Sequence, residues 1–576
     1  MTKQEELQFY IEKYPELSPV LILKVSVTKN GTVFTDRAMN RLQGMDYRFT
    51  KEEPFGIQLD IRKEDFYIPG AVMFRDGSSV LVNYGEPYED PFTVDYDEAE
   101  DTFLLMDGDK LVDTVDFIPR PAFFDKVTSR GTHMDFIGGT CTGQRLLING
   151  FQRCRFWEHG EQCHYCALFA ADTTLEGEVN LTDIAETVRE ASREPGRFTE
   201  ISVSGGSDFG GEPPFSVEVD RYIRVLNAVS GDVQGKIETQ LQAPAYKKED
   251  IRRIYENTCL TSYRPNIEVW DKASFERMCP GKTRWIGRDE WIRRMVDAVE
   301  VFGKGRVYTQ MVCGAELAGP DGMKDVSRAI ASATEGAEFL ASNGVSCHEE
   351  IWRPHRLEKL GWQKMQELDY FIQLAERFHD IRKAHGICAV DTNFMRGSDN
   401  PDLDLERADF AEELPVQRSA VTSSMRREEY AAIPVPEQVK AFVSGKNVRV
   451  YAGVDEERAI SLTSGLTVLE GKYLMLPMES DRSTLSSYLV KSLWFKSPVT
   501  LYVTDGTTTM KLQCRVYRNH IVGTKFRRML DLVRESGAMQ DMACTAELHL
   551  LRAETCTMPK LNIMDEGARY THCHLG

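Results

Sequence analysis

The sequence lacks any run of about eighteen apolar residues, the minimum length for a membrane-spanning helix. Its amino terminus is charged and amphipathic, with no apolar core of the kind that a secretory signal needs. Internal repeats and low-complexity tracts are lacking as well. We therefore expect no membrane span and a cytoplasmic location.

The chain is also poor in positive charge. Its 70 Lys and Arg residues face 89 Asp and Glu residues, which gives a formal net charge of -19. Such a charge disfavours general attraction to a phosphate backbone or an anionic membrane, so we expect neither nucleic acid nor membrane as a partner. We expect no disulfide framework either, because thirteen cysteines, an odd number spread over 576 residues, favour reduced thiols, some of them metal ligands.

The pattern of apolar residues divides the chain into four segments. Residues 1–135 and 436–576 carry short β-like stretches and predict a β-rich amino-terminal and an α+β carboxyl-terminal accessory domain. Residues 396–435, rich in Asp, Glu, Pro and Ser, predict a linker or surface crossing. In the outer domains we expect strands at 19–27, 71–74, 79–83, 447–451, 466–476, 499–504 and 508–517, and a helix at 524–535.

Between residues 136 and 395, apolar strands alternate with long helical segments, which is typical of a parallel α/β domain. Six strand–helix units fall short of a closed eightfold barrel. The fold class predicted is therefore α/β, a partial (β/α)6 TIM-like barrel between β-rich accessory domains. The expected strands are 146–149, 200–204, 236–241, 263–270, 307–313 and 346–352, and the expected helices are 183–193, 217–229, 248–256, 289–302, 323–342 and 357–384.

A cysteine loop follows the first of these strands. Cys154, Cys163 and Cys166 have C-x8-C-x2-C spacing, and three thiolates on one loop can hold three corners of an iron–sulfur cluster and leave the fourth iron open. A structural zinc site normally needs four protein ligands. The alternative interpretation is therefore a zinc knuckle completed by His159, His164 or Cys141.

The loop ends in Cys-His-Tyr-Cys and precedes a six-unit α/β domain, and in both respects it resembles the radical S-adenosylmethionine (radical SAM) superfamily. The resemblance covers about 250 central residues, by the count of predicted elements. It implies a [4Fe–4S] cluster on Cys154, Cys163 and Cys166, an open iron chelated by SAM, and Tyr165 against the adenine. The commonest spacing in the family is C-x3-C-x2-C, so the insert 155–162 is a departure that could reach over the site.

Further matches to the family lie at the ends of the predicted strands. A glycine turn after the second strand, with a second Gly-Gly-Glu-Pro at 210–213, would receive the amino group of SAM, and a Gly-x-Glu turn after the fifth would pack near the adenine. Polar residues on the third and fourth strands would share one face by strand alternation and fit the ribose or methionyl end of SAM. The residues so assigned are Gly205, Gly206, Ser207, Gly314, Glu316, Glu238, Gln240, Gln242, Asn266 and Glu268.

Other chemistry-bearing residues have weaker signals. The cations Arg288, Arg353 and Lys282 could bind the SAM carboxylate or an anionic substrate, although a solvated surface position is the simpler interpretation. Cys279 precedes a Pro-Gly turn and is expected to be a plain buried cysteine, as are Cys259, Cys313, Cys347 and Cys388. An auxiliary cluster is a further possibility at the end of the chain, on Cys544, Cys556 and Cys573 with His572 and His574.

The resemblance implies an oxygen-sensitive enzyme that reductively cleaves SAM to a 5′-deoxyadenosyl radical, with a reductant such as ferredoxin or flavodoxin. The pattern is nearest to the biotin synthase and hydrogenase-maturase branch, so we expect a small organic substrate and bond cleavage, rearrangement or methyl transfer. One alternative is a peptide- or protein-modifying enzyme with an auxiliary cluster. The alternative from another class is a zinc-stabilised binding or scaffold protein.

Overall fold

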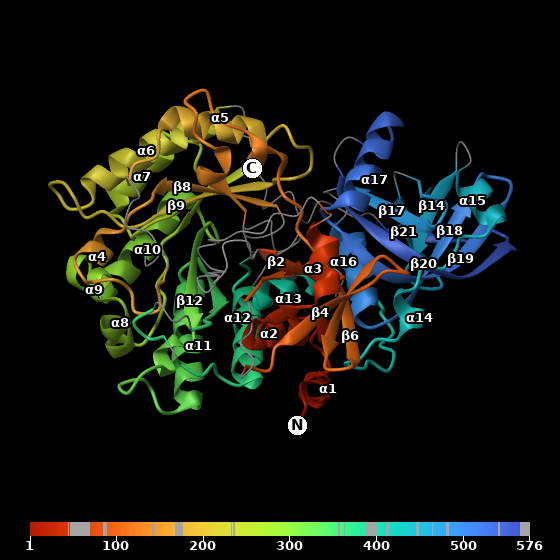
Figure 1. The fold of residues 1–576 in the computed structure, drawn as a ribbon, viewed down its shortest axis with the longest axis horizontal. Helices are drawn as coiled ribbons and strands as arrows, with labels where there is room; N and C mark the ends of the chain where they lie inside the picture. The colour runs from red at the N-terminus through yellow and green to blue at the C-terminus, as the bar shows by residue number, and fades with distance from the viewer. Residues whose placement is uncertain are drawn as a thin grey trace.

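The described residues form three β-sheets in a computed structural model of the 576-residue chain. Figure 1 shows the seven-stranded sheet on the left, the six-stranded sheet in the centre and the eight-stranded sheet on the right. The structure describes the chain except for residues 44, 46–68, 84–88, 141–143, 168–176, 232, 234–236, 355–357, 362, 388–399, 410–413, 445–447, 463–464, 480–482, 540–541 and 565–576.

The central segment forms the sheet with strand order β13-β12-β11-β10-β9-β8-β7. Strands β8 to β13 are parallel, and β7 (Gly138–Gly139) is antiparallel to β8. The α/β class is confirmed, and the sheet is a half-barrel with its helices outside (Figure 1). Its strands and helices are β8 (Arg145–Phe151), α5 (Leu181–Ala191), β9 (Glu200–Gly205), α6 (Ser216–Ser230), β10 (Glu238–Gln242), α7 (Lys248–Glu256), β11 (Ser262–Arg264), α10 (Arg288–Phe302), β12 (Val307–Cys313), α11 (Val326–Ser342), β13 (Val345–Ile351) and α12 (Leu368–Ala384).

The two faces of this sheet differ in polarity. Apolar side chains such as Ile201 and Val203 are fully buried, and Tyr263 stacks on Phe302 of α10, so this face packs against the helices. The register pairs Gln240 with Ser202 and Ser262, and Gln242 with Arg264, on the opposite face. The expected polar face of the third strand is confirmed.

The fourth strand is shorter than predicted. β11 ends at Arg264 because Pro265 has no N–H to continue the ladder. Pairing resumes only as a single bridge between Glu268 and Met311, and Glu268 has a left-handed φ of 68°. The regular alternation predicted for Asn266 and Glu268 is therefore wrong, and each side chain has to be placed by its own contacts.

The amino-terminal segment mixes helices with its sheet, whose order is β1-β4-β5-β6-β2-β3. The strand predicted at 19–27 is wrong: the stretch belongs to helix α2, capped by Ser18 with Pro19 in the first turn. Residues 20–27 are all buried, so no amphipathic period marks the helix. The elements are α1 (Lys3–Lys13), α2 (Pro19–Asn30), β1 (Thr32–Phe34), α3 (Asp36–Gln43), β2 (Ala71–Met73), β3 (Ser79–Leu81), β4 (Phe92–Asp97), β5 (Thr102–Asp107) and β6 (Lys110–Phe117).

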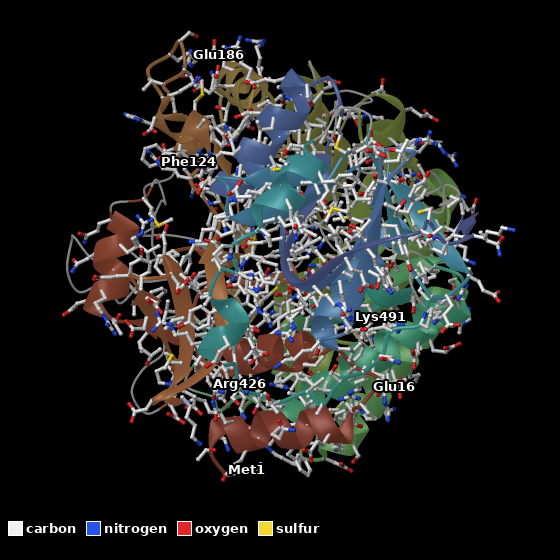
Figure 2. The ribbon with its side chains drawn as sticks, turned by 90° about the vertical axis from the view of Figure 1, so that its right-hand side faces the viewer. Met1, Glu16, Phe124, Glu186, Arg426 and Lys491 are labelled. Atoms are coloured by element: carbon white, nitrogen blue, oxygen red, sulfur yellow. The ribbon has the colours of Figure 1, made fainter. Side chains whose placement is uncertain are left out.

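Helix α1 joins this segment to the half-barrel. Lys13 forms an ion pair with Asp369 at the start of α12, and the Tyr14 hydroxyl donates to the same carboxylate over 2.6 Å. Figure 2 shows α1 between Met1 and Glu16, with Glu16 beside the green helices of the half-barrel. None of the helices in the described part of the chain is long and apolar enough to cross a bilayer.

The carboxyl-terminal sheet has the order β16-β17-β20-β19-β18-β14-β15-β21. The predicted hairpin and the helix at 524–535 are confirmed, whereas the strand predicted at 466–476 is itself a hairpin of β16 and β17. The elements are α14 (Arg427–Tyr430), α15 (Glu437–Val443), β14 (Arg449–Gly453), β15 (Arg458–Leu462), β16 (Thr467–Leu469), β17 (Tyr473–Glu479), α16 (Ser483–Trp494), β18 (Pro498–Thr504), β19 (Thr509–His520), α17 (Thr524–Glu535), β20 (Met542–Cys556) and β21 (Asn562–Met564).

The segment predicted as a linker or surface crossing contains a buried helix, α13 (Pro401–Asp409). Asp402 and Asp404 of this helix are at most 1% exposed. Asp402 binds Arg382 of α12, and Asp404 binds Lys24 of α2 over 3.0 Å. The surface prediction is wrong here because acidic residues, which normally mark solvent, are neutralised by buried cations.

Candidate functional site

The three cysteines lie on the loop after β8, at the carboxyl edge of the parallel sheet. Cys154 caps the short helix α4 (Arg155–Glu158), and the Cys166 N–H donates to the Cys163 carbonyl over 3.1 Å. All three are partly exposed free thiols. Burial, with a smaller contribution from the neighbouring Cys163, raises the pKa of Cys154 to about 11. Two of the predicted ligands are thus brought together.

The insert between the first two cysteines packs on a helix, α9 (Pro280–Trp285). The Gly281 N–H donates to the Glu161 carbonyl over 3.0 Å, and Trp285 donates its indole N–H to the Glu161 carboxylate. A Cβ on Gly281 would lie 2.5 Å from the Phe156 ring, so only glycine lets the insert approach this closely. The helix therefore serves as a platform for the cysteine loop.

Cys279, at the start of this platform, contacts the cysteine loop directly. Its sulfur lies 3.7 Å from the Tyr165 hydroxyl and hydrogen-bonds the thiol of Cys163. That hydrogen bond lowers the pKa of Cys163, while burial raises the pKa of Cys279 well above its ordinary value. Cys279 is thus a direct neighbour of Cys163, a position that its Pro-Gly sequence context did not reveal.

A buried ion pair lies beside these thiols. Lys282 of α9 donates to Glu268 Oε1 over 2.6 Å and to the Asn266 carbonyl over 2.8 Å. The Asn266 side chain accepts from the Gln310 N–H instead of facing a ligand. Burial lowers the pKa of Lys282, but the charge of Glu268 more than compensates, so its pKa is raised. Lys282 is therefore a buried cation, not a solvated one.

The glycine turn after β9 touches the cysteine loop. A Cβ on Gly206 would lie 2.0 Å from the Arg153 carbonyl and 2.5 Å from Cys154 Cβ. The Gly206 N–H donates to the Phe151 carbonyl, and the Ser207 carbonyl accepts from the Arg155 N–H over 2.8 Å. The predicted glycine turn, which includes Gly205, therefore packs directly against the backbone around the first cysteine.

Glu268 and Glu316 line one small cavity together with Met311, Cys313 and residues of α11. Glu316 accepts from the Gly314 N–H and from the Tyr370 hydroxyl. Burial raises the pKa of Glu316. The two predicted glutamates therefore meet, on the side of the sheet that faces α11.

The remaining predicted residues have other positions. Arg288 donates to the Trp270 carbonyl over 2.7 Å, and Arg353 binds Glu89 and the end of α2. Glu238 accepts from Thr261, whereas Gln240 Oε1 is buried and has no hydrogen-bond partner within the described ranges. Arg288 and Arg353 thus have protein partners.

The zinc alternative finds little support in the described residues. No three His, Cys, Asp or Glu side chains there converge on one metal position. The His159 ring packs edge-on against Phe209 with 5.0 Å between centroids, and Cys141 lies outside the described residues.

The proposed auxiliary cluster is contradicted for two of its cysteines. Cys544 and Cys556 lie on one continuous strand, β20, which separates them by roughly 40 Å at 3.3 Å per residue. They cannot share a cluster. Cys573, His572 and His574, like Cys388, lie outside the described residues.

No protein-family model matches the chain. A curated protein, bacteriochlorophyllide c C-7(1)-hydroxylase of Chlorobaculum limnaeum, is 21% identical over 236 residues, which are 38% of this chain and 56% of that protein. The chain thus spans about half the length of this relative.

Three solved structures overlap parts of the chain. HydG, a maturase of the [FeFe]-hydrogenase, has a TM-score of 0.31 and 14% identity, covering 42% of this chain and 49% of HydG. A radical SAM methyltransferase from Sphaerobacter thermophilus has a TM-score of 0.30 and 17% identity, covering 50% and 71%. The cobalamin-dependent S-adenosylmethionine radical enzyme OxsB has a TM-score of 0.26 and 13% identity, covering 59% and 45%.

Two of these three structures, those of the methyltransferase and of OxsB, are of radical SAM enzymes. The overlaps are partial, and the identities and TM-scores are low. The radical SAM interpretation therefore stays a prediction from the cysteine loop of this chain.

Proposed function

We propose that this chain is a radical SAM enzyme built on a partial (β/α)6 barrel. Cys154, Cys163 and Cys166 bind a [4Fe–4S] cluster, and SAM binds the iron that they leave open. The observation that carries the proposal is the placement of three reduced thiols on one loop at the carboxyl edge of a parallel sheet. Ligands of open α/β sheets bind at this edge.

The donor set fits such a cluster. Each cysteine of a cubane binds a different iron, so the three sulfurs need not converge on one point as they would around zinc. The hydrogen bond from Cys279 to Cys163 also favours the thiolate, the form that binds iron. The chemistry that the cluster supplies when bound is an electron for reductive cleavage of SAM to methionine and a 5′-deoxyadenosyl radical.

The chain's own residues position and enclose this chemistry. The close approach of Gly206 to Cys154 fixes the first ligand against the end of β9. Helix α9 holds the insert through Gly281 and Trp285, which keeps the loop folded over the sheet edge. Tyr165 is held beside Cys279, and we propose that it lies against the adenine. Gly205, Ser207, Glu268 and Glu316 complete the proposed SAM site.

The substrate that we propose is a small organic molecule, bound on the polar inner face of the half-barrel. Removal of hydrogen from it leads to bond cleavage, rearrangement or methyl transfer. The electron donor would be a ferredoxin or flavodoxin. The division into two accessory domains, 1–135 and 436–576, around the barrel is part of the same proposal.

The test is reconstitution under argon with ferrous ion and sulfide, followed by SAM and dithionite. We expect about four irons per chain and release of 5′-deoxyadenosine. Cys163→Ala should lose both, whereas Cys259→Ala, another partly exposed cysteine outside the loop, should keep both. A colourless protein with one zinc, or full activity in Cys163→Ala, would contradict the proposal.

A further inference from the structure

Arg264, the last residue of β11, is a buried cation that forms no ion pair with any residue the structure describes. It is 7% exposed, and its Nε has no hydrogen-bond partner. Its one recorded contact within the described residues is with the Tyr308 ring, 5.0 Å from the guanidinium carbon. Two other buried arginines do form ion pairs, Arg145 with Glu200 and Arg382 with Asp402. Buried charges are normally paired or bound to a ligand.

Two neighbouring side chains also have unused polar atoms. Gln240 Oε1 and the Tyr308 hydroxyl are buried and lack hydrogen-bond partners among the described residues. Gln242 of β10 pairs with Arg264 in the register, which puts Gln240, two residues earlier, on the same inner face of the sheet. Three adjacent strands thus present one amide, one guanidinium and one phenol with free hydrogen-bonding capacity.

Two carboxylates close enough to affect Tyr308 are engaged elsewhere. Asp402 and Glu350 both influence the pKa of Tyr308, which burial raises far more strongly. Asp402 accepts from Arg382 and contacts His348 Nδ1 at 3.0 Å, and Glu350 accepts from Gln310 over 2.7 Å. Neither carboxylate is recorded as an ion-pair partner of Arg264.

The inner face is accessible from the edge that carries the cysteine loop. Residues low on the strands, such as Glu200 and Ser262, are buried, whereas Asn149 near the end of β8 is exposed. Ser204 and Gln242, at the carboxyl ends of their strands, are partly exposed. A ligand on this face would therefore lie between Arg264 and the cysteine loop.

We propose that Arg264, with Tyr308 and Gln240, binds an anionic group of the substrate, a carboxylate or a phosphate. A guanidinium binds either group through two parallel hydrogen bonds, and the phenol supplies a third donor. Gln240 accepts from a hydroxyl or amine next to that anion. That the anionic group belongs to the substrate rests on the function proposed above. Binding of an anion does not itself require the cluster.

The experiment measures binding of two probes, sodium phosphate and sodium succinate, by calorimetry under argon, with and without reconstituted iron. Sodium chloride at equal ionic strength is the blank. We expect wild-type protein to bind at least one probe at one site, and Arg264→Met to bind it at least about tenfold more weakly. The affinity of Arg264→Lys should fall between those of the wild type and Arg264→Met. Arg193→Met, at an exposed position just after α5, is the control and should match the wild type.

The melting temperature separates a binding role from a structural one. Because Arg264 forms no ion pair with any described residue, Arg264→Met should melt at the same or a higher temperature than the wild type without ligand. The bound probe should raise the melting temperature of the wild type and not that of Arg264→Met. A variant that unfolds, or that keeps the wild-type affinity for both probes, would overturn the proposal.

Two further results have fixed meanings. If Arg264→Met loses SAM affinity and succinate competes with SAM, Arg264 binds the cofactor and the proposal is wrong. If the wild type binds neither probe, the proposal is also wrong. If reconstitution gives no iron but anion binding is retained, the proposed radical SAM function is wrong and the proposed anion site stands.

Discussion

The Lys282 ammonium lies 2.6 Å from Glu268 Oε1, and the pair is buried beside the thiols of Cys163 and Cys279. Glu268 adopts a left-handed φ that a residue with a side chain rarely takes. Strained residues of this kind cluster at functional sites, where the surrounding contacts impose the conformation. The ion pair and the backbone of Glu268 thus fix one wall of the proposed site.

We predict that Lys282→Met destabilises the protein by about 3–5 kcal/mol, because Glu268 would remain buried without its partner. The measurement is urea unfolding at neutral pH. The double variant Lys282→Met/Glu268→Gln should lose less than the single variant, since no unpaired charge remains. Equal losses in the two variants would show that the pair does not act as a unit.

Cys279 should tune the cluster without binding it. Cys279→Ala should retain the iron of the wild type but show a more negative reduction potential, because a hydrogen bond to a ligand sulfur stabilises the reduced cluster. Redox titration followed by electron paramagnetic resonance gives the potential. Cys279→Ser, which keeps a donor, should lie close to the wild type. Loss of iron in Cys279→Ala would instead make Cys279 a ligand.

Gly206→Ala should prevent normal assembly of the cysteine loop. The added Cβ would overlap the Arg153 carbonyl and Cys154 Cβ, both of which belong to the loop backbone or its first ligand. We expect iron content after reconstitution to fall several-fold. Gly139→Ala is the matched control, because its Cβ would meet nothing within 4 Å. Equal iron content in the two variants would refute the close packing described here.

Glu218 of α6 should make stability depend on pH. Burial raises the pKa of Glu218 to about 8, although Tyr246 donates a hydrogen bond to it. Between about pH 4.5 and 8 the unfolded chain loses the proton that the folded protein keeps, so the free energy of unfolding falls with rising pH. The slope approaches about 1.4 kcal/mol per pH unit.

The measurement is urea unfolding at several pH values in the wild type and in Glu218→Gln. The difference between the two should grow with pH, in favour of the variant. Glu256→Gln, at an exposed position at the end of α7, is the control and should show the wild-type slope. A constant difference between wild type and Glu218→Gln would show that Glu218 is ionised throughout.

The half-barrel was predicted well from the sequence because its apolar strands and amphipathic helices alternate and differ in the spacing of their apolar residues. The strand at 307–313 and the helix at 248–256 have the predicted bounds. Helix α2 was missed because apolar residues cover all its sides, and the fourth strand was overextended because Pro265 breaks the ladder within an apolar run. Helix α13 was missed because Asp402 and Asp404 resemble surface residues until Arg382 and Lys24 are placed beside them.

The candidate site shows the same limit. The cysteine spacing and the glycine turn after β9 are local patterns, and the sequence shows them. The position of Cys279 depends on residues more than a hundred positions away, that of Lys282 on burial against Glu268, and that of Arg264 on the lack of an ion-pair partner among the described residues. Tyr165 and Cys279, for example, are 114 residues apart in the chain. No spacing rule connects such residues before the chain is folded.

Helix α13 limits how the protein can be shortened. An expression fragment that stops at residue 395 would remove Asp402 and Glu406, and the Arg382 guanidinium would lose both anionic partners inside the protein. His348 on the last strand would lose Asp402 at the same time. A fragment that keeps the half-barrel intact therefore has to extend through residue 409, because α13 packs as part of the half-barrel although it follows it in the chain.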